Sequence, residues 1–257
     1  MNLKMKNTDS KQRTYTTNEV AQIIGVHVNT VRLYEKSGFI TKPGRKDNGY
    51  RVFTNLHINQ LKIVRLGIEV VIMQNGIRKK AYEIIHHSGL CEFEKALELA
   101  HEYIKTIDIE IKNAHEAIKV SEDLLKQRTH LNEGKLLKHE VSTLLDISMD
   151  TLRNWERNGL LRTNRKENGY RVYTDDDIRH LKIIRSLRCA NYSLSAILRM
   201  LAELDKNSKA NIGVVLDCPS KSEDIVSACD KLVTSLSHAK TNAFEIVKIL
   251  EELINEN

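Results

Sequence analysis

The chain has 257 residues, of which 29% are charged and 5% aromatic, and its formal net charge is +6. No apolar run approaches the roughly 20 residues that a membrane-spanning helix needs, and the basic N-terminal residues lack the apolar core of an export signal. We therefore expect a cytoplasmic protein without membrane contact, whose four scattered cysteines are reduced thiols.

An internal repeat organises the chain. Residues 30–40, TVRLYEKSGFI, are similar to residues 151–161, TLRNWERNGLL. Residues 45–54, RKDNGYRVFT, are similar to residues 165–174, RKENGYRVYT. The offset is 121 residues in the first pair and 120 in the second. A repeat of this length indicates two copies of one domain, which we place at residues 14–90 and 132–204.

Positive charge follows the two copies. Residues 1–90 carry a net charge of +9 and residues 135–205 carry +3, whereas residues 91–134 carry −4 and residues 206–257 carry −2. Basic modules separated by acidic spacers are typical of proteins that bind nucleic acid. A lysine-rich solvated face would give a smaller version of the same excess.

The first copy begins after a lead-in, residues 1–13, that we expect to be disordered. Thr17 is the expected cap of a helix over residues 18–24, whose Val20, Ile23 and Ile24 share one face. A glycine ends this helix and a second helix follows at residues 29–36, so the pair predicts a helix-turn-helix. Residues 45–51 predict a hairpin wing with Asn48-Gly49 at its turn. A third helix follows, capped by Thr54.

The second copy predicts the same elements. Helices are expected at residues 138–145 and 150–157, with Asp146 in the left-handed conformation that Gly25 takes in the first copy. The second wing turns at Asn168-Gly169. Thr174 and Asp177 predict a capping box for the third helix, and residues 192–201 predict a fourth.

The two spacers predict long helices. Apolar residues keep a heptad rhythm from Leu97 to Leu125, with Ser121 as the polar exception, and again from Ile225 to Leu253. We expect coiled-coil helices over residues 91–131 and 221–257, and a loop over residues 205–220. A stripe this narrow is expected to bury itself against one partner helix, either inside one chain as a pseudo-dimer or in a homodimer of like helices.

Both repeated strings resemble the winged helix-turn-helix of MerR-type transcription regulators. The resemblance covers roughly residues 14–73 and 136–204, and both halves of the motif occur twice in the right order. It implies a mainly α fold, made of two winged helix-turn-helix domains that each carry a small β-hairpin wing and are linked by long coiled-coil helices. It also implies that the second helix of each copy enters the major groove of DNA.

Candidate DNA-contacting residues follow from this resemblance and from the chemistry of arginine. Base reading is expected from the start of the second helix. The guanidinium groups on the helix and the wing are expected to contact phosphates, a guanine edge or the minor groove. The candidates are His27, Asn29, Arg32, Tyr34, Arg45, Arg51, Ser148, Asp150, Arg153, Trp155, Arg165 and Arg171. Because the helix starts differ, the two modules are expected to prefer different half-sites.

Several of these positions have a structural alternative. Tyr34 and Trp155 also suit a core aromatic role, and Tyr50 and Tyr170 suit bracing of the wing rather than DNA contact. Arg65 and Arg185 suit either a phosphate contact or a solvated helix face.

The expected function is sequence-specific DNA binding by a bacterial-type transcription regulator that binds two half-sites on promoter DNA. The resemblance implies RNA polymerase as a partner and leaves room for a small-molecule effector. The alternative is an architectural DNA-binding protein without a ligand response. We expect no enzyme activity, cofactor or metal site, because the chain has no nucleophile-elbow, phosphate-loop or clustered metal-ligand motif. His86-His87 near Cys91 lacks a second spaced ligand pair, and a sensing pair of Cys218 and Cys229 is the weaker alternative to a core role for Cys229.

Overall fold

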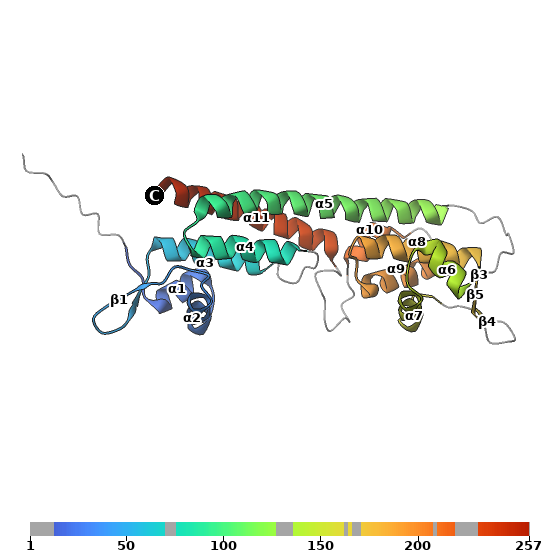
Figure 1. Ribbon diagram of the computed structural model, residues 1–257, viewed down its shortest axis with the longest axis horizontal. Helices are drawn as coiled ribbons and strands as arrows, with labels where there is room; N and C mark the ends of the chain where they lie inside the picture. Colours follow the sequence, from blue (N-terminus) through green and yellow to red (C-terminus); the bar gives the residue numbers. More distant parts are fainter. Residues whose placement is uncertain are drawn as a thin grey trace, which may run out of the picture. The chain divides into compact units, whose positions relative to one another are not determined.

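The computed structural model describes residues 13–69, 76–126, 136–161, 164–165, 171–207, 210–218 and 231–256. These residues form a mainly helical fold with short antiparallel hairpins (Figure 1), as the sequence predicts. None of the helices in the described ranges is long and apolar enough to cross a membrane. The expected disordered lead-in lies outside the described residues except for Arg13.

Module 1 consists of four helices and one hairpin. The helices are α1 (Thr17–Ile24), α2 (Val28–Lys36), α3 (Asn55–Ile68) and α4 (Ile77–Gly89), and the strands are β1 (Gly44–Arg45) and β2 (Arg51–Val52). The cap of α1 is Thr16 rather than Thr17. The Thr16 hydroxyl accepts the Glu19 backbone N–H, and the Glu19 carboxylate accepts the Thr16 backbone N–H, which completes a capping box.

The turns of module 1 follow the predicted chemistry. Gly25 ends α1 with a φ of 71°, in the left-handed region that favours glycine. Arg45 pairs with Arg51 across the wing, whose turn contains Gly49 at a φ of 80°. Tyr15 forms an antiparallel bridge with Phe53 and so fastens the N-terminal segment to the base of the wing.

The core of module 1 lies between α1, α2 and α3, and α4 packs on α3. Val20, Ile24, Val31 and Leu61 are buried in it. Ile23 was expected on the same core face, but it is 49% exposed, so the buried stripe of α1 is narrower than the sequence suggests. The fourth helix was not predicted for this copy.

Module 2 repeats this plan. Its elements are β3 (Leu136–Leu137), α6 (Lys138–Leu145), α7 (Met149–Arg157), β4 (Asn164–Arg165), β5 (Arg171–Tyr173), α8 (Asp175–Cys189) and α9 (Leu194–Lys206), and its strand order is β3-β5-β4. Asp146 takes the left-handed conformation, with a φ of 49°, and Thr174 and Asp177 form the capping box, so both predictions are confirmed. The turn of this wing, with Asn168-Gly169 and Tyr170, lies outside the described residues.

The spacers form two long helices and one short helix. Helix α5 spans Phe93–Lys126, α10 spans Ile212–Asp217 and α11 spans Leu232–Glu256. The seven predicted heptad positions from Leu232 to Leu253 are all buried. On α5 the agreement is partial, because Leu97, Ile111, Ile118 and Leu125 are only half-buried. The stretch 205–220 was expected to be a loop, but it contains α10, which packs on α9 through buried Ile212 and Leu216. Ile225 and Cys229 lie outside the described residues.

The chain divides into two compact units. One holds module 1, the start of α5 up to Lys105 and the end of α11 from Thr241. The other holds the rest of α5 from Thr106, module 2, α10 and α11 up to Lys240. Within the second unit the Lys240 ammonium lies 2.6 Å from the Asp108 carboxylate, which joins α11 to α5. Each unit therefore contains one winged module and segments of both long helices.

Candidate nucleic-acid interface

The second helix of each module begins with a side chain that caps it. The Nδ1 atom of His27 accepts the Asn29 backbone N–H at 3.2 Å, and the Ser148 hydroxyl accepts the Thr151 backbone N–H at 3.0 Å. Both side chains are exposed. These two base-reading candidates therefore lie at the surface, and each also satisfies a free N–H at a helix start.

An arginine lies about one turn further along each of these helices, and its side chain is exposed to solvent. Arg32 donates to the Asn29 side-chain oxygen at 3.3 Å in module 1, and Arg153 donates to the Asp150 carboxylate at 2.9 Å in module 2. The partner is neutral in module 1 and anionic in module 2. The same surface position therefore differs by one charge between the two modules.

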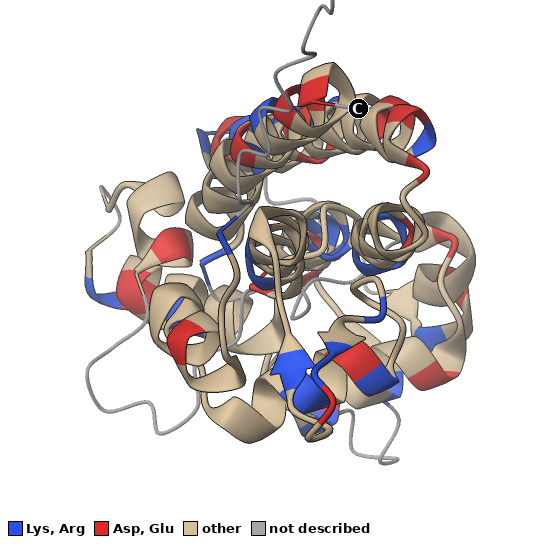
Figure 2. Ribbon diagram, turned by 90° about the vertical axis from the view of Figure 1, so that its left-hand side faces the viewer, with Lys and Arg blue, Asp and Glu red and all other residues tan. Residues whose placement is uncertain are grey.

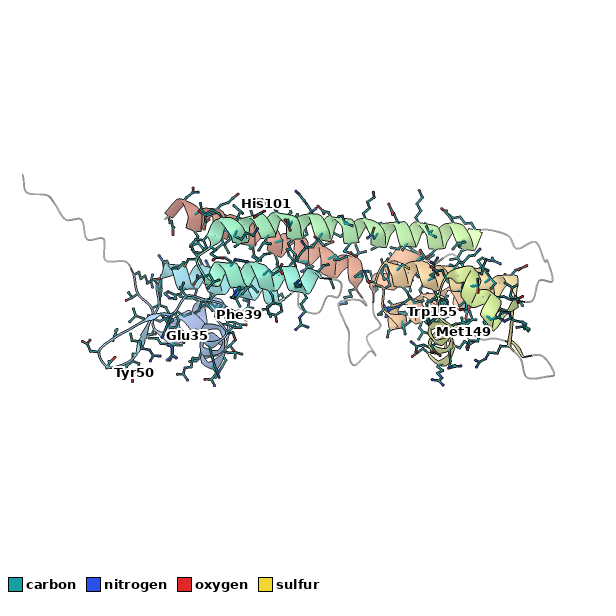
Figure 3. All side chains as sticks on the ribbon, in the orientation of Figure 1. Glu35, Phe39, Tyr50, His101, Met149 and Trp155 are labelled. Atoms are coloured by element: carbon teal, nitrogen blue, oxygen red, sulfur yellow. The ribbon has the colours of Figure 1, made fainter. Side chains whose placement is uncertain are left out.

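One arginine of each wing is bound to the second helix. The Nε atom of Arg51 lies 2.5 Å from the Glu35 carboxylate, and Arg171 makes the same ion pair with Glu156 at 2.5 Å. Figure 3 labels Glu35 on α2. We expected Arg51 and Arg171 to contact phosphate or the minor groove, and the structure gives each of them a second role, which is to link the wing to the helix. We call this repeated ion pair the wing clamp.

The wing clamp of module 2 has two additional partners. The Glu156 side chain is 4% exposed, receives the Tyr173 hydroxyl at 2.5 Å and lies 3.6 Å from the Lys138 ammonium. Burial and the hydrogen bond to Glu156 raise the pKa of Tyr173, so its hydroxyl stays protonated and donates. Module 1 has Phe53 at the equivalent position, so its clamp lacks this donor.

The tip of wing 1 carries the exposed candidates. Arg45 is exposed and donates to the Gly49 carbonyl at 3.1 Å. Tyr50 is 70% exposed near the tip (Figure 3), so it does not brace the wing by burial. Figure 2 colours the lysines and arginines blue. Arg45 lies on β1 and Arg51 lies on β2. The backbone of Arg165 is described in β4, but its side chain lies outside the described part of the second wing.

The aromatic candidates of the two modules differ in exposure. Trp155 is 4% exposed and belongs to the core of module 2, so it has almost no surface with which to contact DNA. Tyr34 is half-buried, its ring lies 6.1 Å from that of Phe39, and burial raises the pKa of its hydroxyl. Trp155 therefore has the core aromatic role that was the alternative to DNA contact, and Tyr34 has this role only in part.

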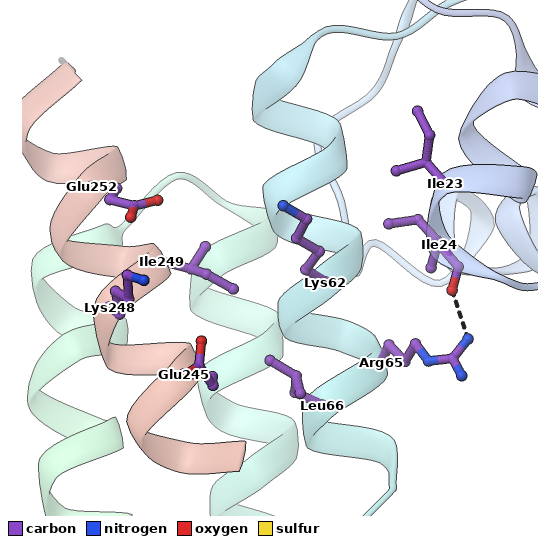
Figure 4. A pocket seen from close by; sticks show the side chains of 9 residues that line it. All are labelled: Ile23, Ile24, Lys62, Arg65, Leu66, Glu245, Lys248, Ile249 and Glu252. Atoms are coloured by element: carbon purple, nitrogen blue, oxygen red, sulfur yellow. Dashed lines mark hydrogen bonds between the residues drawn. The ribbon is translucent and has the colours of Figure 1, made fainter. Parts of the chain in front are cut away.

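Arg65 and Arg185 perform a role that the sequence interpretation missed. Arg65 donates to the carbonyls of Ile24 and Gly25, at 2.6 and 2.9 Å (Figure 4), and so caps the end of α1. Arg185 lies 3.8 Å from Asp146, the residue that ends α6. Arg65 thus fixes the turn before the second helix, and Arg185 lies beside the equivalent turn of module 2. The 120-residue offset between the two arginines was the available signal.

Arg65 also lines a groove of about 510 Å³ within the first unit. The groove lies between α1, α3 and the last turns of α11 (Figure 4), and its apolar surface includes the exposed Ile23. Its charged residues are of both signs, with Lys62, Arg65 and Lys248 against Glu245 and Glu252. The described residues contain no group of three or more potential metal ligands.

Two helix-turn-helix units, each with a wing clamped to an exposed second helix, define a tandem winged helix-turn-helix protein. Residues 16–53 match the family model described as MerR family regulatory protein, and residues 139–204 match the model described as MerR HTH family regulatory protein. Both modules are therefore MerR-type helix-turn-helix domains, placed in tandem in one chain.

Individual relatives match parts of the chain. The HTH-type transcriptional regulator CueR of Escherichia coli O157:H7 is 40% identical over 52 residues, which cover 20% of this chain and 38% of CueR. The HTH-type transcriptional regulator ZntR of Escherichia coli strain K12 is 33% identical over 64 residues, covering 24% of this chain and 45% of ZntR.

A longer match is the heavy metal-dependent transcription regulator 1 of Rhizobium meliloti strain 1021, 29% identical over 117 residues, which cover 42% of this chain and 80% of that protein. The chain spans less than half the length of CueR and ZntR. No solved structure matches the chain.

Proposed function

We propose that this chain is a DNA-binding transcription regulator that binds two half-sites of a promoter, one with each module. Double-stranded DNA is the proposed partner, with RNA polymerase as the second partner by family resemblance. The observation that supports the proposal most directly is the exposed start of α2 and α7. Each start places an arginine one turn behind a capping residue, on a helix that the clamp fixes to its wing.

The proposed contacts divide by chemistry. The exposed groups at the helix starts, His27 and Asn29 in one module and Ser148 and Asp150 in the other, are proposed to read base edges. Arg32, Arg153, Arg45 and Arg165 are proposed to contact phosphate or base edges. Because Arg51, Arg171 and Trp155 serve the frame of each module, we propose that they position the readers without contacting bases.

We further propose that one chain supplies both halves of the DNA-binding unit. Support comes from the segments of α5 and α11 that pack within each compact unit, including the ion pair between Lys240 and Asp108. A second chain is then unnecessary for two readers. Light scattering tests this directly: a monomeric mass at micromolar concentration supports the pseudo-dimer, and a stable dimer contradicts it.

A binding-site selection with the full chain tests the regulatory function. Starting from random duplexes, we expect enrichment of a discrete site with two unlike half-sites about one helical turn apart. Footprinting of the selected site at a promoter should then protect a bounded region. Uniform coverage with little sequence preference would instead support the architectural alternative, in which DNA is bound through its backbone and its deformability.

A further inference from the structure

We propose that module 2 contains a binding site for a small apolar amine, in a pocket behind its DNA-reading helix. The use of this pocket as an effector site rests on the proposed regulatory function. Binding of the amine does not, and it can be measured without DNA.

The pocket is a leucine-lined cavity of about 530 Å³ in the second compact unit. This volume lies within the range of cavities that hold small organic ligands. Its lining residues are Leu125, Gly159, Leu160, Leu161, Asp177, His180, Leu198, Leu201, Ala202, Leu204 and Asp205. An apolar wall with a few polar groups is the usual composition of a ligand site.

The position of the pocket links it to α7. Gly159, Leu160 and Leu161 follow Asn158, which caps the end of that helix, and Asp177 and His180 come from α8. Leu198, Leu201 and Asp205 come from α9. A ligand here would contact the segment that leads from the reading helix toward the wing.

Module 1 fills the corresponding space with its own residues. Gln60, at the position of His180, is fully buried; its side-chain oxygen accepts the Thr41 backbone N–H at 3.0 Å, and its amide donates to the Ser88 carbonyl at 2.7 Å. The end of α4 also packs so closely that a Cβ on Gly89 would come within 2.4 Å of the Gly38 carbonyl oxygen. Module 1 therefore has no open pocket at the position that corresponds to the pocket of module 2, as far as its described residues show.

In module 2 this closure is absent from the described residues. His180 is exposed and makes no hydrogen bond to the described part of the chain. Gly159 corresponds to Gly38, and the nearest atom to a Cβ built on it is a Leu198 methyl at 3.9 Å. Module 2 therefore has the exposed His180 where module 1 has the buried, hydrogen-bonded Gln60. It also lacks, among its described residues, the close contact between two glycines that module 1 makes, and the pocket stays open.

The charges of the pocket favour a cation. Asp177 uses one carboxylate oxygen in the capping box with Thr174, and Asp205 has no ion-pair partner among the described residues. Asp205 also lies next to the last residue of α9, where the helix dipole disfavours a negative charge. A protonated amine could pair with these carboxylates while its apolar part covers the leucines.

The groove of the first unit supplies an internal control. It has a similar volume, but its exposed Lys62 and Lys248 offset Glu245 and Glu252, so it shows no preference for a cation. Glu252→Gln and Asp205→Asn each remove one carboxylate from the rim of a cavity. They therefore form a matched pair of variants for the same measurement.

The test is a fluorescence titration of the full chain without DNA. The probes are dansylcadaverine, which joins an apolar fluorophore to a protonated alkylamine, and dansyl-6-aminohexanoic acid, which carries a carboxylate instead. We expect one saturable site for the amine and weaker binding of the acid. Asp205→Asn should weaken amine binding about threefold to tenfold, the range of an ordinary hydrogen bond, because Asp205 is exposed to solvent. Glu252→Gln should leave amine binding unchanged.

A second variant tests the place of binding. Leu201→Trp enlarges a lining residue and should reduce amine binding by about tenfold or more, because the added ring occupies the pocket. Thermal unfolding checks that this variant is folded. If Leu201→Trp folds and binds the amine as the parent chain does, the site assignment is wrong. Equal binding of the amine and the acid, or no saturable binding of either, also overturns the proposal.

Discussion

Exchanging the residues at positions 29 and 150 should exchange the DNA affinities of the two modules. These positions correspond in the repeat, and each side chain accepts a hydrogen bond from the arginine one turn later. Asp150→Asn gives module 2 the neutral partner of module 1, and Asn29→Asp gives module 1 the anionic partner of module 2. The two variants therefore change one charge in opposite directions at equivalent places.

The size of the effect follows from exposure and Coulomb's law. Asp150 is 85% exposed and Arg153 is 51% exposed, so their ion pair contributes less than about 1 kcal/mol and can be broken by DNA. A carboxylate about 6 Å from a phosphate repels it by about 0.7 kcal/mol in bulk water and about 3 kcal/mol at a surface dielectric constant of about 20. We therefore expect Asp150→Asn to tighten binding by about 1 kcal/mol, or about fivefold, and Asn29→Asp to weaken it equally.

Fluorescence anisotropy measures both changes at several salt concentrations, with a duplex of unrelated sequence beside the selected one. The unrelated duplex isolates the charge effect, because the base contacts proposed for Asn29 and Asp150 do not contribute to binding there. The effects should shrink as salt rises, because exposed charges are screened. Asp150 also lies in the first turn of α7, where a negative charge stabilises a helix by about 0.3–1 kcal/mol, so thermal unfolding must accompany the titration. If both variants fold and neither changes affinity, or if both change it in the same direction, these helix starts do not face DNA as proposed.

Arg32→Ala and Arg153→Ala should each weaken specific binding by about 1–3 kcal/mol in the same anisotropy assay, and unchanged affinity would exclude that module from the interface. Glu156→Gln should lower the free energy of unfolding by about 1–3 kcal/mol in urea titrations, because it leaves the half-buried Lys138 and Arg171 without their anion; a loss well under 1 kcal/mol would contradict the clamp. Burial lowers the pKa of His57 below its ordinary 6.5, so the unfolded chain binds protons more readily. Stability should thus be full above pH 6.5 and fall below it, and His57→Asp, which copies the capping residue of module 2, should flatten melting temperatures between pH 7 and 5.5.

The sequence predicted the elements whose signals are local. Capping residues, turn glycines and heptad stripes act within a few residues, so both helix-turn-helix units, the wing of module 1 and the buried face of α11 were found. The one-residue error at the first cap arose because Thr16 and Thr17 are adjacent and both can cap. Helix α10 was missed because a helix of six residues is too short to show a helical period in its sequence.

The roles of single side chains were harder to predict because they depend on contacts distant in sequence. Arg51 has the composition of a phosphate ligand, yet its carboxylate partner stands 16 residues earlier. Arg65 reaches carbonyls about 40 residues away. Trp155 shares its motif position with the half-buried Tyr34, and only the packing of module 2 shows that it is buried. An internal repeat helps here, because a pair of residues that recurs in both copies is a candidate for contact.

The repeat separates the frame of each module from its working surfaces. The wing clamp joins Glu35 to Arg51 in one copy and Glu156 to Arg171 in the other, so both copies share the contact that links the wing to the second helix. The copies differ at two places. The partner of the arginine on the second helix is neutral in one copy and anionic in the other, and the third helix carries Gln60 in one copy and His180 in the other. Because both differences lie outside the clamp, module 2 can lose affinity for phosphate and gain a pocket without losing its fold. We therefore expect an unequal pair of DNA-binding modules, in which module 1 contributes more to DNA affinity and the contribution of module 2 responds to a ligand in its pocket.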